Sequence, residues 1–501
     1  MRERADQLKT QVRRKLQQLA TSSGVADTLA LVDALERLDV DNHFREEITT
    51  ALLRVVHCNE HECTVAASSG DDNGDLHVTS LRFRLLRQHG FRVSADVFDK
   101  FRDNIGNFRE SLSSDTRGLL SLYNAAHLAM PGEEALDDAI AFSRRHLRSI
   151  EGKLMSPMAE QVSRALDIPL PRYPKRLETM CYIAECSKDP AMFDGAGAVL
   201  ELARLDFELL RFLHLRELKD LSLWWREVYD SVKLSYARDR IVELYFWACG
   251  SFHEEEYSRT RIILTKVLAF ISLLDDTYDI HATIEECHKL NRAIQSSFDE
   301  FEDNLEPHEK YRVSYAKSGY KQLSEYYCRE AQWSSDKYMP SFAEHVELSV
   351  MSSAYPALVM TALVGVHDEA TATVEAFEWL ASMPDFVRAS GEVLRFLNDI
   401  ASNKVRRNEK DLPSTVECYM AEHGVDSKVA VAAVAALAEH AWRTINQASI
   451  EVDPTRLPVT QLVVNLTRVI EVIYPRGQDL YTFTTDIKGV IANLFLDPVL
   501  V

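Results

Sequence analysis

Along most of this chain, apolar residues recur three and four positions apart, which is the spacing of one face of an α-helix. Leu8, Val12, Leu16 and Leu19 are an example near the start. No segment shows a convincing alternation of apolar and polar residues, as a half-buried strand would. Glycine and proline, which end helices and form tight turns, number only 17 and 15 among 501 residues, roughly half their usual share. The sequence therefore predicts an all-α protein with long helices.

The distribution of these patterns predicts two helical domains. Helical spacing is interrupted by the turn-rich segment 63–74 and then continues to about residue 202. From residue 205 onward apolar residues are denser, and segment 262–274 is apolar on nearly every face, which indicates a helix buried on all sides. We place an N-terminal domain at residues 1–204 and a C-terminal domain at residues 205–501.

Charge and composition exclude several classes of protein. With 57 Lys and Arg against 77 Asp and Glu, the net charge is −20, which repels nucleic acid and anionic lipid. The eight cysteines do not form a disulfide framework and indicate a reducing compartment. The apolar run 429–438 has ten residues, where a membrane span needs about twenty. The N-terminus lacks the apolar core of a signal peptide. We expect a cytoplasmic protein with no nucleic-acid partner and no stable membrane insertion.

Three aspartates follow directly after the apolar segment, in the sequence Asp275-Asp276-Thr277-Tyr278-Asp279. Unpaired charges at the end of a core helix are costly. Asp275 and Asp279 share one helix face, while Asp276 is turned about 100° away. Two carboxylates on one face favour a hard divalent cation such as Mg²⁺ or Mn²⁺, and such ions also bind phosphate oxygens. The alternative is a solvated helix end, where aspartates would oppose the helix dipole.

A second oxygen-rich cluster contains Asn398 and Ser402, again after an apolar helical segment. The two residues are four positions apart and share a helix face. They predict half of another metal site, although Asn and Ser are also common at frayed helix ends. The presence of the first cluster strengthens the metal interpretation of the second.

Both clusters resemble motifs of the plant class I terpene synthases, closest to the sesquiterpene synthase branch. Residues 275–279 resemble the family's aspartate-rich motif, and residues 398–402 resemble the start of its second metal motif. Segment 238–240, with the sequence Arg-Asp-Arg, is similar to the family's Arg-x-Arg segment, and Trp247 is similar to its active-site tryptophan. The resemblance covers essentially the whole chain.

The C-terminal region carries a further part of the resemblance. Tyr474, Asp479 and Tyr481 are similar to the family's lid and pocket segment, although Leu480 stands where that segment usually has glycine. The resemblance implies a C-terminal class I bundle of helices that encloses an apolar pocket. It also implies a vestigial N-terminal domain, because segment 39–42 lacks the last carboxylate of a class II acid motif.

The same resemblance implies a set of site residues and three Mg²⁺ ions, with Mn²⁺ as an alternative metal. The expected metal ligands are Asp275, Asp279, Asn398, Ser402 and Glu330. The residues expected to bind the substrate, directly or through metal, are Arg238, Asp275, Asp279, Arg395, Asn398 and Lys404. The residues expected to act in catalysis are Arg238, Arg240, Trp247, Tyr474, Asp479 and Tyr481. Arg238 and Arg240 would face apart on a helix, so both can reach one ligand only if their segment is a loop.

The implied reaction is the metal-dependent ionisation of farnesyl diphosphate by a monomeric enzyme. Pyrophosphate is released, and the carbocation cyclises to a sesquiterpene hydrocarbon or alcohol. A monoterpene synthase that uses geranyl diphosphate is an alternative. A prenyl elongase is disfavoured, because such enzymes carry a second aspartate-rich motif in place of residues 398–402.

Two departures from the family pattern keep another alternative open. Arg406 stands where the second metal motif usually has a glutamate ligand, and a guanidinium repels Mg²⁺. This puts the third ion in doubt. Family members also usually carry a further few dozen N-terminal residues. A homologue that binds prenyl diphosphates without turnover is therefore the remaining alternative.

Overall fold

The computed structural model describes residues 2–22, 24–57, 75–188, 196–234, 236–280, 283–403, 413–483 and 487–497. Across these ranges the regular structure is helical, and the single bridge between Arg102 and Phe108 is the only β-type pairing. The prediction of an all-α protein is confirmed for this part of the chain.

The chain forms two compact units. The first unit consists of residues 1–211 together with 449–451 and 497–501, and the second consists of residues 212–448 together with 452–496. The boundary lies within the long helix α10 (Ala196–Val232). The division at residues 204 and 205 expected from the sequence falls in the same helix and stays a prediction.

The first unit contains α-helices connected by short 3₁₀ turns. Its helices before α10 are α1 (Arg2–Ser22), α2 (Val25–Arg37), α3 (Arg45–His57), α5 (Leu76–Gln88), α6 (Thr116–Ala126), α7 (Glu134–Ile150), α8 (Met158–Asp167) and α9 (Lys175–Lys188). The 3₁₀ turns are η1 (Asp41–Phe44), η2 (Ala95–Phe101), η3 (Glu110–Ser114), η4 (Glu151–Lys153) and η5 (Leu170–Arg172). A core that includes Phe83, Leu119 and Leu136 holds α5, α6 and α7 together.

The second unit is a larger helical bundle. Its α-helices after α10 are α11 (Ile241–Ser251), α12 (Ser258–Ile280), α13 (Ile284–Asp303), α14 (Tyr311–Asp336), α15 (Phe342–Ser352), α16 (Tyr355–Val364), α17 (Val374–Ala381), α18 (Asp385–Ser402), α19 (Thr415–His423), α20 (Ser427–Glu451), α21 (Leu457–Ile473) and α22 (Ile487–Phe495). Its 3₁₀ turns are η6 (Glu255–Tyr257), η7 (Pro454–Arg456) and η8 (Pro475–Gly477).

Local sequence explains where several of these helices begin. In a capping box, a serine or threonine accepts a hydrogen bond from the backbone N–H three residues on, and a glutamate at that position accepts one in return. The pairs that form such boxes at α13, α15 and α19 are Thr283 with Glu286, Ser341 with Glu344, and Ser414 with Glu417. Helices α12 and α18 bury long apolar faces in the bundle. Burial of these faces determines where the two helices lie.

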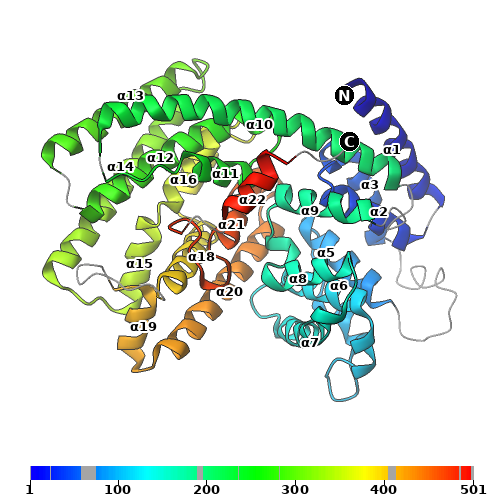
Figure 1. The fold of residues 1–501 in the computed structure, drawn as a ribbon. Coiled ribbons are helices and arrows are strands. Elements are labelled where there is room, and N and C mark those ends of the chain that lie inside the picture. Colours follow the sequence, from blue (N-terminus) through cyan, green and yellow to red (C-terminus); the bar gives the residue numbers. More distant parts are fainter. Residues whose placement is uncertain are drawn as a thin grey trace. The chain divides into compact units, whose positions relative to one another are not determined.

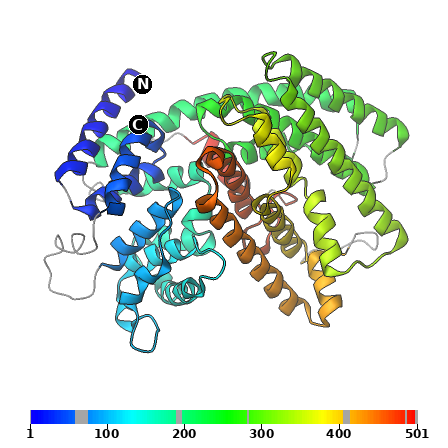
Figure 2. The ribbon, with the colours of Figure 1, turned by 180° about the vertical axis from the view of Figure 1, so that it is seen from behind.

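Helix α12 lies at the centre of the second unit. Leu264, Val267, Phe270 and Leu273 are all buried, which confirms that its apolar stretch is a core helix. It packs against α11 and α16, and α14 packs against α16. Helix α18 lies between α15 and α21 (Figures 1 and 2). The helices that carry the two oxygen-rich clusters therefore belong to one bundle.

Two helical stretches in this bundle have the length and hydropathy of a membrane span, although each contains polar residues among the apolar ones. They are Phe342–Val364 and Pro454–Gly477, and 78% and 67% of their most apolar windows are buried inside the protein. The first is broken between α15 and α16, where Ala354 has a φ of 65°. Burial within the unit accounts for their composition, as it does for core helices in general.

Candidate active site

The segment that carries Arg238 and Arg240 is a loop. It connects α10, which ends at Val232, to α11, which begins at Ile241. The structure thus meets the geometric condition that the sequence set for these two arginines. Arg238 lies against the end of α12, where its guanidinium is hydrogen-bonded to Asp276. Arg240 donates through Nη2 to the carbonyl oxygen of Thr482 at 3.1 Å, in the C-terminal segment.

Asp275 presents a carboxylate at the C-terminal part of α12. Its side chain is 46% exposed, and its Oδ2 lies 3.5 Å from Nη2 of Arg238. The Asp275 carboxylate is thus accessible to solvent, whereas the core residues of α12 before it are buried. Asp279 also lies in α12, but its side chain is outside the described residues.

Aromatic residues surround this end of α12. Tyr481 donates a hydrogen bond to Ser272 Oγ at 2.7 Å, and the guanidinium carbon of Arg238 lies 5.7 Å from its ring centroid. Burial raises the pKa of Tyr481 to about 12, so the phenol is neutral. Trp247 packs edge-on to Tyr481, with ring centroids 6.4 Å apart. Its buried indole Nε1 has no hydrogen-bond partner among the described residues.

Asp479 has a local structural contact. Its Oδ1 accepts hydrogen bonds from the backbone N–H groups of Tyr481 at 3.0 Å and Thr482 at 2.8 Å. Such bonds hold a turn in shape. Asp479 therefore fixes the backbone that presents Tyr481.

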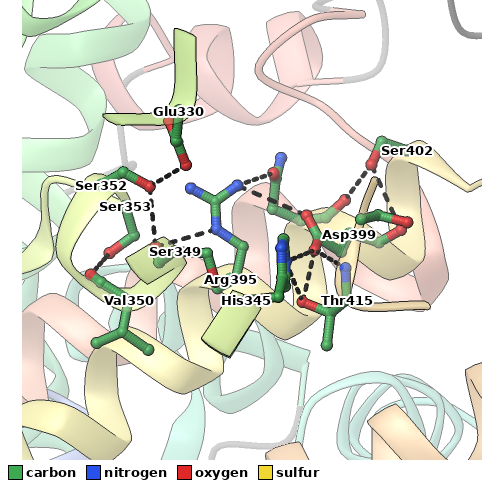
Figure 3. A network of polar contacts seen from close by, with 12 residues as sticks. Glu330, His345, Ser349, Val350, Ser352, Ser353, Arg395, Asp399, Ser402 and Thr415 are labelled. Atoms are coloured by element: carbon green, nitrogen blue, oxygen red, sulfur yellow. Dashed lines mark hydrogen bonds and ion pairs between the residues drawn. The ribbon is translucent and has the colours of Figure 1, made fainter. Parts of the chain in front are cut away.

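A second polar cluster connects α14, α15 and α18 (Figure 3). Ser352 donates a hydrogen bond to Glu330, and Nε of Arg395 donates to the carbonyl oxygen of Ser349 at 3.3 Å. Burial raises the pKa of Glu330, and the charge of Arg395 opposes that effect. Nη1 of Arg395 lies 3.5 Å from Oδ1 of Asn398. Figure 3 shows the Arg395 guanidinium between the Glu330 side and the Asp399 side of this cluster.

Asp399, the neighbour of Asn398, is directed into the protein. Its Oδ2 accepts hydrogen bonds of 2.6 Å from both the backbone N–H and the hydroxyl of Thr415, the first residue of α19. Its carboxylate also lies 3.5 Å from His345 and 3.6 Å from Arg395 (Figure 3). Burial alone would raise the pKa of Asp399, but the hydrogen bond with His345 and the charge of Arg395 outweigh it, so that the pKa is lowered. This aspartate anchors the end of α18.

Tyr327 of α14 is buried within the second unit. Burial raises the pKa of this phenol well above its ordinary value, and the charges of Asp275 and Glu330 raise it further, whereas the charge of Arg395 lowers it. Carboxylates from α12 and α14 and an arginine from α18 therefore act on one buried hydroxyl. Tyr474 extends the connection: burial raises its pKa, and a hydrogen bond with Asn398 opposes the shift.

The donor set around this region fits a hard divalent cation. Asp275 offers carboxylate oxygens, and Asn398 offers an amide oxygen. Ser402 donates its hydroxyl hydrogen to the carbonyl oxygen of Asn398 at 3.0 Å, and a hydroxyl oxygen is a type of group that can ligate a hard cation. Glu330 adds a half-buried carboxylate that accepts a hydrogen bond from Ser352. All of these ligands are oxygens, as Mg²⁺ and Mn²⁺ prefer.

Some predicted site residues are outside the described part of the chain. These are Lys404 and Arg406, together with the side chain of Asp279. Other contacts were missed from the sequence, including those of Asp276, Asp399 and Tyr327. One feature of the sequence could have indicated the contacts of Asp276 and Asp399. Each directly follows a predicted metal ligand, so its side chain is turned about 100° away from that ligand on the helix.

Comparison with known proteins places the chain in a family. A family model described as "Terpene synthase, N-terminal domain" matches residues 1–166, and one described as "Terpene synthase family, metal binding domain" matches residues 226–297 and 292–444. A eudesmanediol synthase from Zea mays is 52% identical over 525 residues, covering 100% of this chain and 91% of that protein. The chain belongs to the terpene synthase family. An alpha-copaene synthase from Zea mays is 42% identical, covering 99% of this terpene synthase and 95% of the relative.

Solved structures of other terpene synthases share the whole fold. Isoprene synthase from grey poplar leaves, in complex with three Mg²⁺ ions and dimethylallyl-S-thiolodiphosphate, is 28% identical with a TM-score of 0.88, covering 99% of this chain and 97% of that one. Limonene synthase with 2-fluorolinalyl diphosphate is 28% identical with a TM-score of 0.87, covering 99% and 94%. The fold is the two-domain terpene synthase fold, and the family's metal-binding domain identifies a divalent metal as the cofactor of this terpene synthase.

Proposed function

We propose that this protein ionises farnesyl diphosphate with release of pyrophosphate and cyclises the carbocation to a sesquiterpene hydrocarbon or alcohol. The family supports the reaction class, and the similarity to eudesmanediol and alpha-copaene synthases supports a sesquiterpene product. The observation that carries the proposal is that Asp275, in a chain that matches the family's metal-binding domain, presents a 46% exposed carboxylate 3.5 Å from the guanidinium of Arg238. We expect the second oxygen-rich motif, on α18 of the same bundle, to face the same region.

The proposed metal is Mg²⁺, with Asp275, Asp279, Glu330, Asn398 and Ser402 as the residues that would hold it. When bound, such ions stabilise the negative charge that develops on the departing pyrophosphate. We expect three ions; the count depends on how the chain accommodates Arg406, which lies outside the described residues. Mn²⁺ prefers the same oxygen ligands.

The chain's own residues bind the diphosphate and shield the cation. Arg238 and Arg395 supply guanidinium donors, which match phosphate oxygens in geometry and charge. The faces of Trp247 and Tyr481 carry partial negative charge and attract a carbocation without reacting with it. Tyr474 is buried beside Asn398 and adds a further aromatic wall.

The C-terminal segment closes this region against water. Arg240 binds the carbonyl oxygen of Thr482, and the side chain of Asp479 holds the turn before it. A cation protected from bulk water can rearrange before it loses a proton to give a hydrocarbon, or before a single water molecule adds and loses a proton to give an alcohol. We further propose a monomer in the cytoplasm; the spacing of the eight cysteines is not that of a disulfide framework, which supports a reducing compartment.

Incubation of the purified protein with farnesyl diphosphate and Mg²⁺, followed by mass analysis of volatile products, tests this function. We expect a sesquiterpene and stoichiometric pyrophosphate. A product only from geranyl diphosphate would identify a monoterpene synthase. Tight diphosphate binding without any product would support the non-catalytic alternative.

Asp275→Asn and Asp279→Asn test the metal assignment. Each replacement removes an anionic ligand, so we expect turnover to fall by about a hundredfold or more, with an unchanged circular dichroism spectrum. Asp303→Asn is the matched control, because Asp303 is 85% exposed at the end of α13. Wild-type turnover in both site variants would contradict the assignment.

A further inference from the structure

The two adjacent aspartates of α12 have different surroundings. The side chain of Asp275 is 46% exposed, whereas that of Asp276 is 6% exposed. Consecutive residues of a helix are turned about 100° apart, so the two carboxylates face different neighbours. Asp275 faces the proposed metal site, and Asp276 faces the loop between α10 and α11. The two residues are therefore suited to different tasks.

Both carboxylate oxygens of Asp276 bind Arg238. Its Oδ2 accepts a hydrogen bond from the backbone N–H of Arg238 at 3.0 Å. Its Oδ1 accepts one from Nε at 2.8 Å and lies 2.6 Å from Nη2. Hydrogen bonds between charged partners are roughly twice as strong as neutral ones. One side chain thus fixes the backbone and the guanidinium of the same arginine.

Residues on both sides of Arg238 are also held. Thr277 donates its hydroxyl hydrogen to the carbonyl oxygen of Leu273 at 2.6 Å, so it accepts the hydrogen bond from the Tyr236 hydroxyl at 3.2 Å. Asp239 accepts a hydrogen bond from Trp225 Nε1 at 2.9 Å. Because this segment is not helical, side chains provide the contacts that a helix would make within its own backbone.

The contacts of Arg238 leave one edge of its guanidinium open. Nε and Nη2 are directed to Asp276, and the face lies toward Tyr481. Nη1 makes no hydrogen bond to the described residues, and the side chain is 29% exposed. A guanidinium presents five N–H donors in a fixed plane. Fixing the Nε edge therefore sets the direction of the donors on Nη1.

We propose that Asp276 is a positioning residue that orients Arg238 toward the diphosphate. This inference rests on the proposed function, in which Arg238 binds the departing pyrophosphate. The contact between Nη2 of Arg238 and Oδ2 of Asp275 is long, at 3.5 Å. It would also compete with metal binding by the Asp275 carboxylate. Asp276 keeps Arg238 in place independently of Asp275, so the motif divides its adjacent carboxylates between metal and arginine.

The alternative role for Asp276 is that of a metal ligand. A carboxylate offers about four lone-pair sites, so the hydrogen bonds to Arg238 do not by themselves exclude ligation. The two roles predict different effects of replacing Asp276 when Arg238 has already been replaced. If Asp276 only positions Arg238, its replacement then causes no further loss of pyrophosphate affinity. If Asp276 is a metal ligand, its replacement still weakens binding. A double-mutant cycle measures this difference.

The first experiment measures the affinity for inorganic pyrophosphate at saturating Mg²⁺ by calorimetry. We expect Asp276→Ala and Arg238→Gln each to weaken binding about tenfold, and the double variant to bind as weakly as Arg238→Gln alone. The half-saturating Mg²⁺ concentration is expected to rise in Asp275→Ala and to stay within about threefold of wild type in Asp276→Ala. The proposal would be overturned if the double variant lost pyrophosphate affinity by the product of the two single losses. It would also be overturned if Asp276→Ala needed as much Mg²⁺ for half-saturation as Asp275→Ala.

The second experiment needs neither metal nor substrate. Asp276 accepts the backbone N–H of Arg238, so hydrogen exchange of a peptide covering 236–241 is expected to accelerate in metal-free Asp276→Ala. Asp275→Ala is the matched control and should exchange like wild type. Arg238→Gln loosens the same contact from the other side if Asp276→Ala does not fold. If hydrogen exchange of peptide 236–241 is the same in folded Asp276→Ala as in wild type, the proposal is contradicted. An absence of product from wild-type protein with accelerated exchange in Asp276→Ala would instead contradict the proposed function alone.

Discussion

Among single residues, Glu309 carries a clear link between charge and stability. It is buried and accepts hydrogen bonds from Nη1 and Nη2 of Arg259 at 2.8 and 2.7 Å, and from Arg312 at 2.8 Å. The hydrogen bonds from Arg259 lower the pKa of Glu309 to about 2 from 4.5. A depressed carboxylate pKa stabilises the folded state above the unfolded pKa, and this contribution is lost as the pH falls from about 4.5 toward 2.

Glu309→Gln is expected to lower the free energy of unfolding at pH 7 by about 3 kcal/mol, because it removes this ionised partner from two arginines. Urea unfolding at pH 7, 5, 4 and 3 checks the prediction, and the difference from wild type should shrink below pH 4.5. Glu306→Gln is the control, since the Glu306 side chain is exposed. A difference that is constant across this pH range would show that Glu309 is not the titrating group.

Among the secondary-structure elements, the end of α16 lies directly on the first turn of α12. A Cβ added at Gly365, the C-cap of α16, would lie 2.3 Å from Thr260 Cα and 2.6 Å from Thr260 N. Gly365→Ala therefore forces the two helices apart. We expect it to lower the free energy of unfolding by about 1–3 kcal/mol. Gly489→Ala in α22 meets no atom within 4 Å and is expected to be neutral or stabilising, as denaturant melts of both variants would reveal.

The elements were predictable from sequence where their determinants are local. Helical spacing predicted α12, and the 398–402 pattern predicted the shared face at the end of α18. Contacts between distant positions were not predictable. Asp276 binds Arg238 across 38 positions, and Asp399 binds Thr415 across 16, so no spacing rule connects them. The surroundings of Tyr327 were not predictable either, because an aromatic residue in a helical pattern is most often an ordinary core residue.

For the whole molecule, ligand binding should stabilise the two units unequally. The proposed ligands come from α12, α14 and α18, which all belong to the second unit. A ligand that binds only the folded state stabilises it by about 2.7 kcal/mol at one hundred times its dissociation constant. If Asp275, Asp279 and Glu330 form one site, as proposed, Mg²⁺ alone would relieve their repulsion, and pyrophosphate would add contacts with Arg238 and Arg395.

Mg²⁺ together with inorganic pyrophosphate is therefore expected to slow hydrogen exchange in peptides from α12 and α18, and EDTA is expected to reverse the effect. Peptides from α5, α6 and α7 of the first unit should exchange at the same rate in both conditions, because their core around Phe83 and Leu119 contains none of the proposed ligands. Mg²⁺ alone should give weaker protection than the combination, since pyrophosphate supplies the bridge between the helices. Equal protection of both units would mean that the diphosphate binds elsewhere than between the two motifs.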